Sequence, residues 1–182
     1  MMRVFLGLPI DKDFEQAVVD QLGNWKNKFK SRLSWIKKGN YHLTLKFLGE
    51  VEENVVEKLK QELLKIEFMP FKLQVKKIGF FYSQRKVRVV WIGFQEELEL
   101  KDYFSKIDGI CFDLGFEREK REYIPHLTLA RVKFFEPSDP WKNFQQALNK
   151  FEWPQLKLKK LVLWQSKLTP QGPFYTPLLE LK

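Results

Sequence analysis

The tetrapeptide His42-Leu43-Thr44-Leu45 occurs a second time as His126-Leu127-Thr128-Leu129, 84 residues further along the chain. The chain has two histidines, and each of them opens one copy. With 25 Leu and four Thr among 182 residues, Leu-Thr-Leu would follow a given His by chance roughly 4 times in 10,000. We therefore interpret the two copies as an internal repeat and build the fold around it.

Both copies have the alternation of a half-buried β-strand. Successive side chains of a strand point to opposite faces, so His42 and Thr44 share one face while Leu43 and Leu45 share the other. The second copy repeats this pattern. If a pseudo-twofold axis relates the two halves, two imidazoles and two hydroxyls converge on one cleft, and the leucines pack against helices.

The flanking sequence predicts further strands and amphipathic helices. Asp11 or Asp13 and Asp139 are candidate helix N-caps, and Gly115 is expected to end a helix. Strands are expected at 4–8, 41–48, 71–81, 87–94, 123–132, 156–164 and 174–181, and helices at 11–29, 53–66, 97–114 and 140–151. Because helices and strands mix without strict alternation, we expect an α+β fold with antiparallel sheets. Residues 1–182 would form one domain of two similar lobes around a central cleft.

The composition indicates a basic, well-packed protein. A hydrophobic fraction of 44% is enough for a core and argues against disorder. The 32 Lys and Arg outnumber the 23 Asp and Glu, giving a net charge of +9. Such a surface attracts polyanions such as RNA, and a solvated lysine-rich surface would give the same balance.

The cysteine content and the apolar run near the start of the sequence indicate the cellular compartment. Cys111 is the single cysteine, so an internal disulfide is excluded and a reducing cytoplasm fits. The apolar run at 4–10 is too short for a membrane span and lacks the features of a signal peptide. We expect a cytoplasmic protein that does not enter a membrane.

Two facing imidazoles suit the cleavage of a phosphodiester. A histidine with a pKa near 6.5 is available in either protonation state near neutrality. One can take a proton from water while the other gives a proton to the leaving ribose oxygen, each contributing typically ~10²–10⁴ in rate. Thr44 and Thr128 can donate hydrogen bonds to the non-bridging oxygens. This chemistry needs no metal and no cofactor. A two-histidine metal site is the alternative, but no further ligands stand at metal spacing.

Three polar residues near the repeats each have two interpretations. Lys46 is in phase with Thr44, so it either extends the polar face toward RNA or is a solvated charge at the rim. Arg131 is offset by five from His126 and would face away from the cleft in a regular strand, unless a β-bulge turns it. Tyr123, three residues before His126, is equally ambiguous.

Three aromatic residues also have two interpretations. Phe5, Trp35 and Trp164 can stack on a nucleobase, a contact worth roughly 1–3 kcal/mol. The hydrophobic core is the favoured place for each of them.

The chain resembles the two-histidine (2H) phosphoesterases, and within them the RNA 2′,3′-cyclic phosphodiesterases, also called LigT-like proteins or 2′-5′ RNA ligases. That family has two H-x-T-x motifs on strands that flank a cleft between two similar α+β lobes. Residues 41–50 are similar to its first signature and residues 125–131 to its second. Residues 2–5 resemble its opening strand, and residues 166–173 with Tyr175 resemble its closing segment.

The resemblance implies hydrolysis of a terminal 2′,3′-cyclic phosphate of RNA to a 2′-phosphomonoester. It implies that His42 donates a proton to the leaving 3′ oxygen and that His126 accepts a proton from water. It also makes Arg131 a candidate phosphate contact beside Thr44 and Thr128. The residues alone do not fix which histidine is the acid. The expected partners are RNA ends, with tRNA fragments among them, and we expect a monomer.

Alternatives of other kinds stay open. Some relatives run the reverse reaction and join RNA through a 2′-5′ bond. The substrate could be another cyclic phosphate, such as ADP-ribose cyclic phosphate. A non-catalytic RNA-binding module could also keep the cleft, and it would show salt-sensitive binding without turnover.

Overall fold

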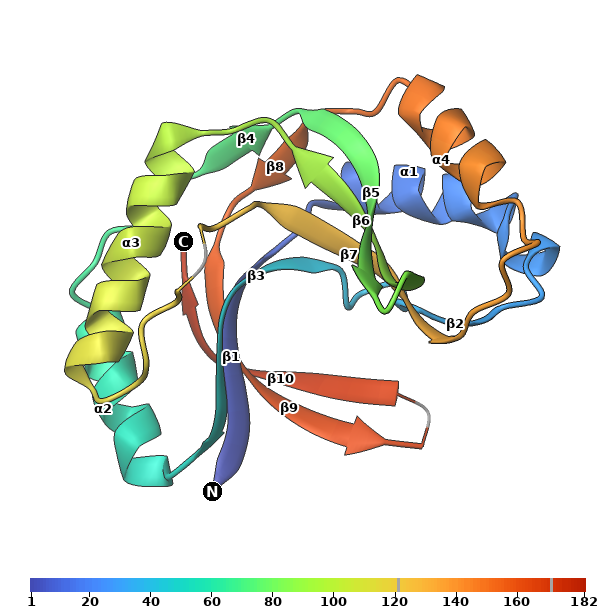
Figure 1. The fold of residues 1–182 in the computed structure, drawn as a ribbon. Helices are drawn as coiled ribbons and strands as arrows, with labels where there is room; N and C mark the ends of the chain where they lie inside the picture. Colours follow the sequence, from blue (N-terminus) through green and yellow to red (C-terminus); the bar gives the residue numbers. More distant parts are fainter. Residues whose placement is uncertain (121, 171) are drawn as a thin grey trace.

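The computed structural model describes residues 1–120, 122–170 and 172–182. Gln171, which belongs to the segment expected at 166–173, lies outside them. The chain forms β1 (Met2–Pro9), α1 (Lys12–Gly23), a 3₁₀ turn (Lys26–Lys28), β2 (Arg32–Trp35), β3 (His42–Val51), α2 (Glu53–Leu63), β4 (Phe71–Leu73), β5 (Val75–Ser83), β6 (Lys86–Phe94), α3 (Leu98–Asp113), β7 (His126–Phe134), α4 (Trp141–Lys150), β8 (Leu156–Leu158), β9 (Leu161–Thr169) and β10 (Gly172–Leu181) (Figure 1). The expected α+β class is confirmed. None of the helices described is long and apolar enough to cross a membrane.

The strand order carries an internal pseudo-twofold. The main sheet runs β10-β9-β1-β3-β7-β6-β5, with β2 paired to β7 and a separate β4-β8 ribbon. The succession β1-α1-β3-α2-β4-β5 recurs as β6-α3-β7-α4-β8-β9. The last strand of each unit pairs with the first strand of the other, because β5 lies beside β6 and β9 beside β1. The expected two similar lobes are therefore present, each completed by a strand from the other unit.

The two lobes meet at the centre of the sheet. The central strands β3 and β7 pair antiparallel at one point, Leu43 with Leu127. β1 and β6 then flank them on the outside over much longer registers. Because the central pairing is so short, β3 and β7 diverge on either side of it, and the two halves of the sheet turn away from each other (Figure 1).

Each central strand contains a β-bulge at the same place in the repeat. The register of β3 against β1 shifts at Leu45, and the register of β7 against β6 shifts at Leu129. An extra residue reverses the face to which the following side chains point. Phe47 and Arg131, which come after the bulges, therefore return to the face that carries the histidines.

The bulges determine which way the side chains of Arg131 and Lys46 point. Arg131 points into the cleft, so the expectation for a regular strand is wrong and the bulge alternative is confirmed. Lys46 points the other way, and neither interpretation given to it from the sequence holds. Its side chain is 9% exposed and forms a buried ion pair with Asp108 of α3. Lys46 Nζ also donates to the Glu117 carbonyl at 2.7 Å.

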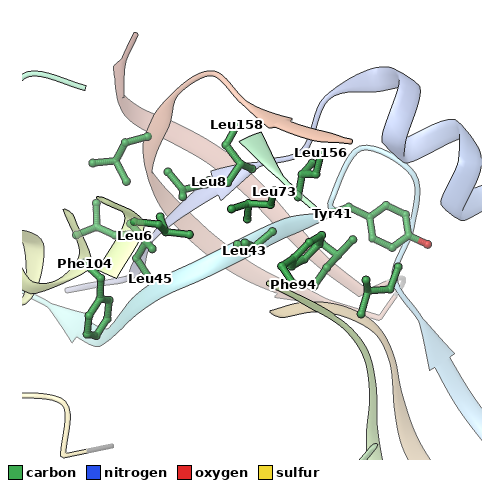
Figure 2. Close-up of a cluster of buried hydrophobic side chains, with 14 of the residues drawn as sticks. Leu6, Leu8, Tyr41, Leu43, Leu45, Leu73, Phe94, Phe104, Leu156 and Leu158 are labelled. Carbon is green, nitrogen blue, oxygen red and sulfur yellow. The ribbon is translucent and has the colours of Figure 1, made fainter. Parts of the chain in front are cut away.

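The hydrophobic core lies on the face opposite the histidines, as the alternation predicted. Figure 2 shows Leu43 and Leu45 of β3 beside Leu6 and Leu8 of β1. All four are at most 5% exposed. Burying one leucine side chain contributes roughly 1.5–3 kcal/mol, so this face fixes the register of the motif strand. The helices α2 and α3 cover one end of the sheet, while α1 and α4 lie at the other (Figure 1).

Of the helix caps predicted from the sequence, the structure confirms Asp11 and contradicts Asp139. Asp11 caps α1, its Oδ1 accepting from the backbone N–H of Asp13 at 3.1 Å and of Phe14 at 3.2 Å. Asp139 was expected to cap α4, and that is wrong because Pro140 occupies the cap. The Asp139 carboxylate instead accepts from the backbone N–H groups of Lys30 and Ser31, at 2.8 and 2.7 Å. This contact anchors the chain just before β2, a four-residue strand too short for its pattern to be recognised in the sequence.

Replacing Asp108 with alanine should destabilise the fold strongly. The substitution leaves the Lys46 ammonium buried without its partner, which typically costs ~3–5 kcal/mol. The free energy of unfolding in urea measures the loss. The matched control is Glu57→Ala, which breaks a surface pair with Lys60 and should cost at most ~0.5 kcal/mol. Similar losses in the two variants would contradict the importance of the buried pair.

Candidate active site

A cavity of about 760 Å³ opens where the lobes diverge. Its walls are the β9–β10 hairpin on one side and β2 with the outer part of β7 on the other (Figure 1). His42 and Thr44 line it from the first motif, and Thr128 and Arg131 line it from the second. The structure therefore brings together residues that lie about half the chain apart. His126 is not among the lining residues, and its ring is held by an exposed contact, whereas the corresponding contact of His42 is partly buried.

The two motifs face each other diagonally. Because Leu43 pairs with Leu127, the antiparallel register sets His42 level with Thr128 and Thr44 level with His126. The four polar side chains share the face opposite the core. Each histidine thus stands across from the threonine of the other motif, as expected for a pseudo-twofold site.

Each imidazole is anchored in the same way. His42 Nδ1 lies 2.8 Å from the Asn40 carbonyl oxygen, and His126 Nδ1 lies 2.9 Å from the Ile124 carbonyl oxygen. A carbonyl oxygen can only accept, so Nδ1 carries the proton and donates in both residues. In the neutral form each histidine then presents an unprotonated Nε2, the atom that can take or return a proton.

The environment lowers the pKa of both histidines. Burial lowers the pKa of His42 to about 4, with smaller contributions from the positive charges of Arg131 and His126. Burial is also the main reason that the pKa of His126 is lowered, and the Arg131 charge adds to it. Both imidazoles are therefore neutral near pH 7 in the protein without substrate.

Aromatic rings enclose His42. Its ring centroid lies 4.9 Å from Phe5, 5.3 Å from Trp164 and 5.5 Å from Tyr175. Phe5 and Trp164 also stack on each other at 5.1 Å. These rings exclude water from the first histidine and hold its plane.

His126 has a more open environment. Phe81 meets its ring edge-on at 5.2 Å, and Trp91 lies 6.3 Å away. The difference follows from two strands outside the repeat. β10 pairs with β9 and brings Tyr175 to His42, and β2 forms the opposite wall of the cavity that His42 lines, whereas β5 is an edge strand whose Phe81 contacts His126.

The other residues singled out from the sequence divide between core and cavity. Trp35 is half-buried and lines the cavity, as does the edge of Phe5, although Phe5 is only 2% exposed. Trp164 is not among the cavity-lining residues and packs on His42. Tyr123 stacks on Phe104 at 4.4 Å and lines a separate hollow of about 280 Å³.

Sequence reasoning missed several residues of the cavity. Phe47 lines it because of the bulge in β3, and the cations Arg3, Lys37 and Lys133 stand around it. No local pattern marks these residues, since β2 and the bulges that orient them were not recognisable in the sequence. The described residues hold no group of three or more His, Cys, Asp or Glu side chains placed to bind a metal ion.

The fold has two similar lobes, and two histidines and two threonines share one face where the lobes meet. The profile of the family LigT like Phosphoesterase matches residues 13–91 and 92–175, one match in each half. The RNA 2′,3′-cyclic phosphodiesterase of Methanocaldococcus jannaschii is 36% identical over 181 residues, covering 98% of this chain and 99% of the relative. The protein of the same name from Archaeoglobus fulgidus is 32% identical over 177 residues, covering 97% and 98%.

Solved structures show the same fold. The protein TT0787 of Thermus thermophilus aligns with a TM-score of 0.79 at 24% identity, covering 99% of this chain and 97% of that one. Escherichia coli LigT complexed with 3′-AMP aligns with a TM-score of 0.78 at 23% identity, covering 98% and 96%. The chain belongs to the LigT-like phosphoesterase family.

The buried His42 should make the folded state sensitive to acid. Its pKa of about 4 in the folded protein lies below the unfolded value near 6.5, so between these values the unfolded chain binds more protons. Stability is therefore lost as the pH falls from 6.5 toward 4. His42→Gln should lose less stability than the wild type as the pH is lowered across this range, measured by urea unfolding at each pH. Equal losses would rule out this contribution.

Proposed function

We propose that the protein is an enzyme that hydrolyses the 2′,3′-cyclic phosphate at an RNA end to a 2′-phosphomonoester. The observation that carries the proposal is the symmetry of the site. Two imidazoles with the same Nδ1 anchor, each across from a threonine of the other motif, stand on one face where the lobes diverge. The names of the relatives support RNA as the substrate over ADP-ribose cyclic phosphate.

We assign the proton-accepting role to His126 and the proton-donating role to His42. In-line displacement at phosphorus sets the incoming water and the leaving oxygen on opposite sides. His126 has the more exposed surroundings of the two histidines, so water would reach it more easily, and its free Nε2 can take a proton. His42 is on the enclosed side, where water would compete least with proton transfer to the leaving 3′ oxygen.

His42 must gain a proton before it can act as the acid. Burial and the charge of Arg131 lower its pKa and so disfavour that proton in the free protein. A bound cyclic phosphate carries a negative charge, which neutralises the field of Arg131 and favours the imidazolium. Binding of the substrate would thus favour the protonated form of His42, which is the form that can act as the acid.

The remaining polar side chains of the cleft suit the phosphate. Thr44 and Thr128 would donate hydrogen bonds to the non-bridging oxygens as negative charge builds there. Arg131, exposed on the same face and close enough to lower the pKa of both histidines, would hold the anion by charge.

RNA as the partner is consistent with the surface around the site. Arg3, Lys37 and Lys133 surround the cavity with positive charge, and the whole chain carries +9. RNA ends, tRNA fragments among them, are the substrates that we propose. Residues 1–182 would act as one catalytic unit, because each lobe supplies one motif, and a monomer suffices. The cytoplasmic location remains a prediction.

The same groups could open the cyclic phosphate with a nucleophile other than water. If the 5′-hydroxyl of a second RNA replaced water at His126, attack on the cyclic phosphate would form a 2′-5′ bond. The expelled 3′ oxygen would take its proton from His42. No nucleotide would be consumed, because the ester bonds exchange directly. This ligation stays a prediction.

Replacing either histidine with alanine should abolish turnover. The wild type should convert an oligoribonucleotide ending in a 2′,3′-cyclic phosphate to a 2′-phosphate with EDTA present. His42→Ala and His126→Ala should each lose at least ~10²–10⁴ in kcat, since each removes a proton-transfer group. Chromatography of the products against 2′- and 3′-phosphate standards measures rate and bond choice. A folded wild type without turnover would favour an RNA-binding module instead.

Substrate binding should be coupled to proton uptake at His42. Binding of cytidine 2′,3′-cyclic phosphate to the inactive His126→Ala variant at about pH 6, below the ordinary histidine pKa, should take up close to one proton. Calorimetry in two buffers of different ionisation enthalpy measures this number. The control is the double variant with His42→Ala as well, which should take up none. Equal uptake by the two variants would contradict the acid role of His42.

A further inference from the structure

A second aromatic surface lies beside His126, outside the cavity. It consists of Phe81 on β5 and Trp91 on β6, with Lys77 at its edge, and we call it the aromatic shelf. Phe81 stacks on Trp91 with a centroid distance of 5.0 Å and an angle of 29°. The Lys77 ammonium lies 5.7 Å from the Trp91 ring centroid.

Two glycines make room for the shelf. A Cβ at Gly79 would lie 2.2 Å from the Trp91 ring, and a Cβ at Gly93 would lie 2.5 Å from it. The indole therefore lies flat on β5 and β6, on the face that carries Thr128 and His126, with which Trp91 and Gly93 pair. Phe81 then stands next to the His126 imidazole.

Phe81 is placed differently from the neighbouring aromatic residues. Its side chain is 38% exposed, although one ring face packs on Trp91. Phe80 points to the opposite face and packs against Trp141 of α4. An exposed aromatic ring next to His126 is suited to stacking with a planar ligand near a phosphate, and Lys77 adds a positive charge over the neighbouring Trp91 ring.

The pseudo-twofold shows what is unusual about this position. Phe81 of β5 corresponds to Trp164 of β9, because each sits on the last strand of its own unit and beside the histidine of the other unit. Trp164 is covered by Phe5 and by Tyr175 from β10. β5 has no outer neighbour among the described strands of the sheet, so the corresponding surface in the second lobe is left open.

The proposed bond choice orients the ribose toward this surface. In a 2′,3′-cyclic nucleotide, C3′ leads to C4′ and the rest of the RNA, and C2′ leads to C1′ and the base. If the 3′ oxygen leaves toward His42, the C3′ side of the ribose faces His42 and the C2′ side faces His126. The RNA chain then continues along the cavity past Arg3, Lys37 and Lys133, and the base is directed toward the His126 side.

We propose that the aromatic shelf binds the nucleobase of the terminal nucleotide by stacking on Phe81. This subsite rests on the proposed function, since the orientation of the ribose follows from the roles of the two histidines. Stacking tolerates any base and favours the larger purines, so the enzyme should accept all four ends with a purine preference.

The test compares two substrates that differ only in the base. One is adenosine 2′,3′-cyclic phosphate, and the other is 1-O-methylribose 2,3-cyclic phosphate, which has none. Phe81→Ala should raise KM about tenfold more for the adenosine substrate than for the base-free substrate, because any effect of the lost contact with His126 is common to both substrates. Phe81→Trp should restore the wild-type KM. The control Tyr82→Ala, at an exposed ring that packs on Phe80 of the opposite face, should change neither substrate.

Two results would overturn the subsite: equal changes for both substrates in Phe81→Ala, or no change for either. Failure of the proposed function has a different signature, because the wild type itself would then hydrolyse neither compound. In that case equilibrium binding of adenosine 2′-monophosphate and of ribose 2-phosphate, followed by tryptophan fluorescence, tests the subsite directly. The Phe81→Ala variant should bind the adenosine compound about tenfold more weakly and the ribose compound equally well.

Discussion

The site depends on one short contact, the antiparallel pairing of β3 and β7 at Leu43 and Leu127. This pair fixes the register of the two motifs, because each strand carries its histidine one residue before the leucine. It also joins the two lobes at a point rather than along an edge. A longer pairing would have made a continuous flat sheet, whereas the short one lets the strands diverge and open the cleft. The buried leucines hold the register, since a slip of one residue would turn both histidines into the core.

The pseudo-twofold gives the site its two equivalent halves, and the strands outside the repeat make those halves different. β10 and β2 enclose the surroundings of His42, and the edge strand β5 leaves His126 open. Unequal surroundings favour different roles for two imidazoles, because they change the pKa of each ring and the access of water to it. In the proposed mechanism, the added strands would favour proton donation by His42 because they enclose its side of the site. The same asymmetry leaves Phe81 of the aromatic shelf exposed, so the proposed division of roles and the proposed base subsite would have one structural origin.

Charge is used in two ways in this fold. Burial lowers the pKa of both histidines, and Arg131, exposed in the cleft, lowers it further, so the free protein holds them neutral. Lys46, at the residue after the bulge in the other motif strand, is buried and binds Asp108 and the Glu117 carbonyl. The segment around Glu117 leads to the second motif, so this ion pair links the strand of the first histidine to the approach of the second.

The sequence by itself determined the repeat, the two histidines and threonines, the α+β class and most helices and strands. It could do so because the alternation of a strand and the period of a helix are local properties. Only the tertiary structure decided which way Lys46 and Arg131 point, that Asp139 anchors the chain before β2, and that one histidine is enclosed while the other is open. The bulges and the strand neighbours depend on pairings between distant segments, and no window of sequence records them. The residues that carry the proposed chemistry were therefore recognisable in the sequence, but the asymmetry between their surroundings arises only when the two halves pack.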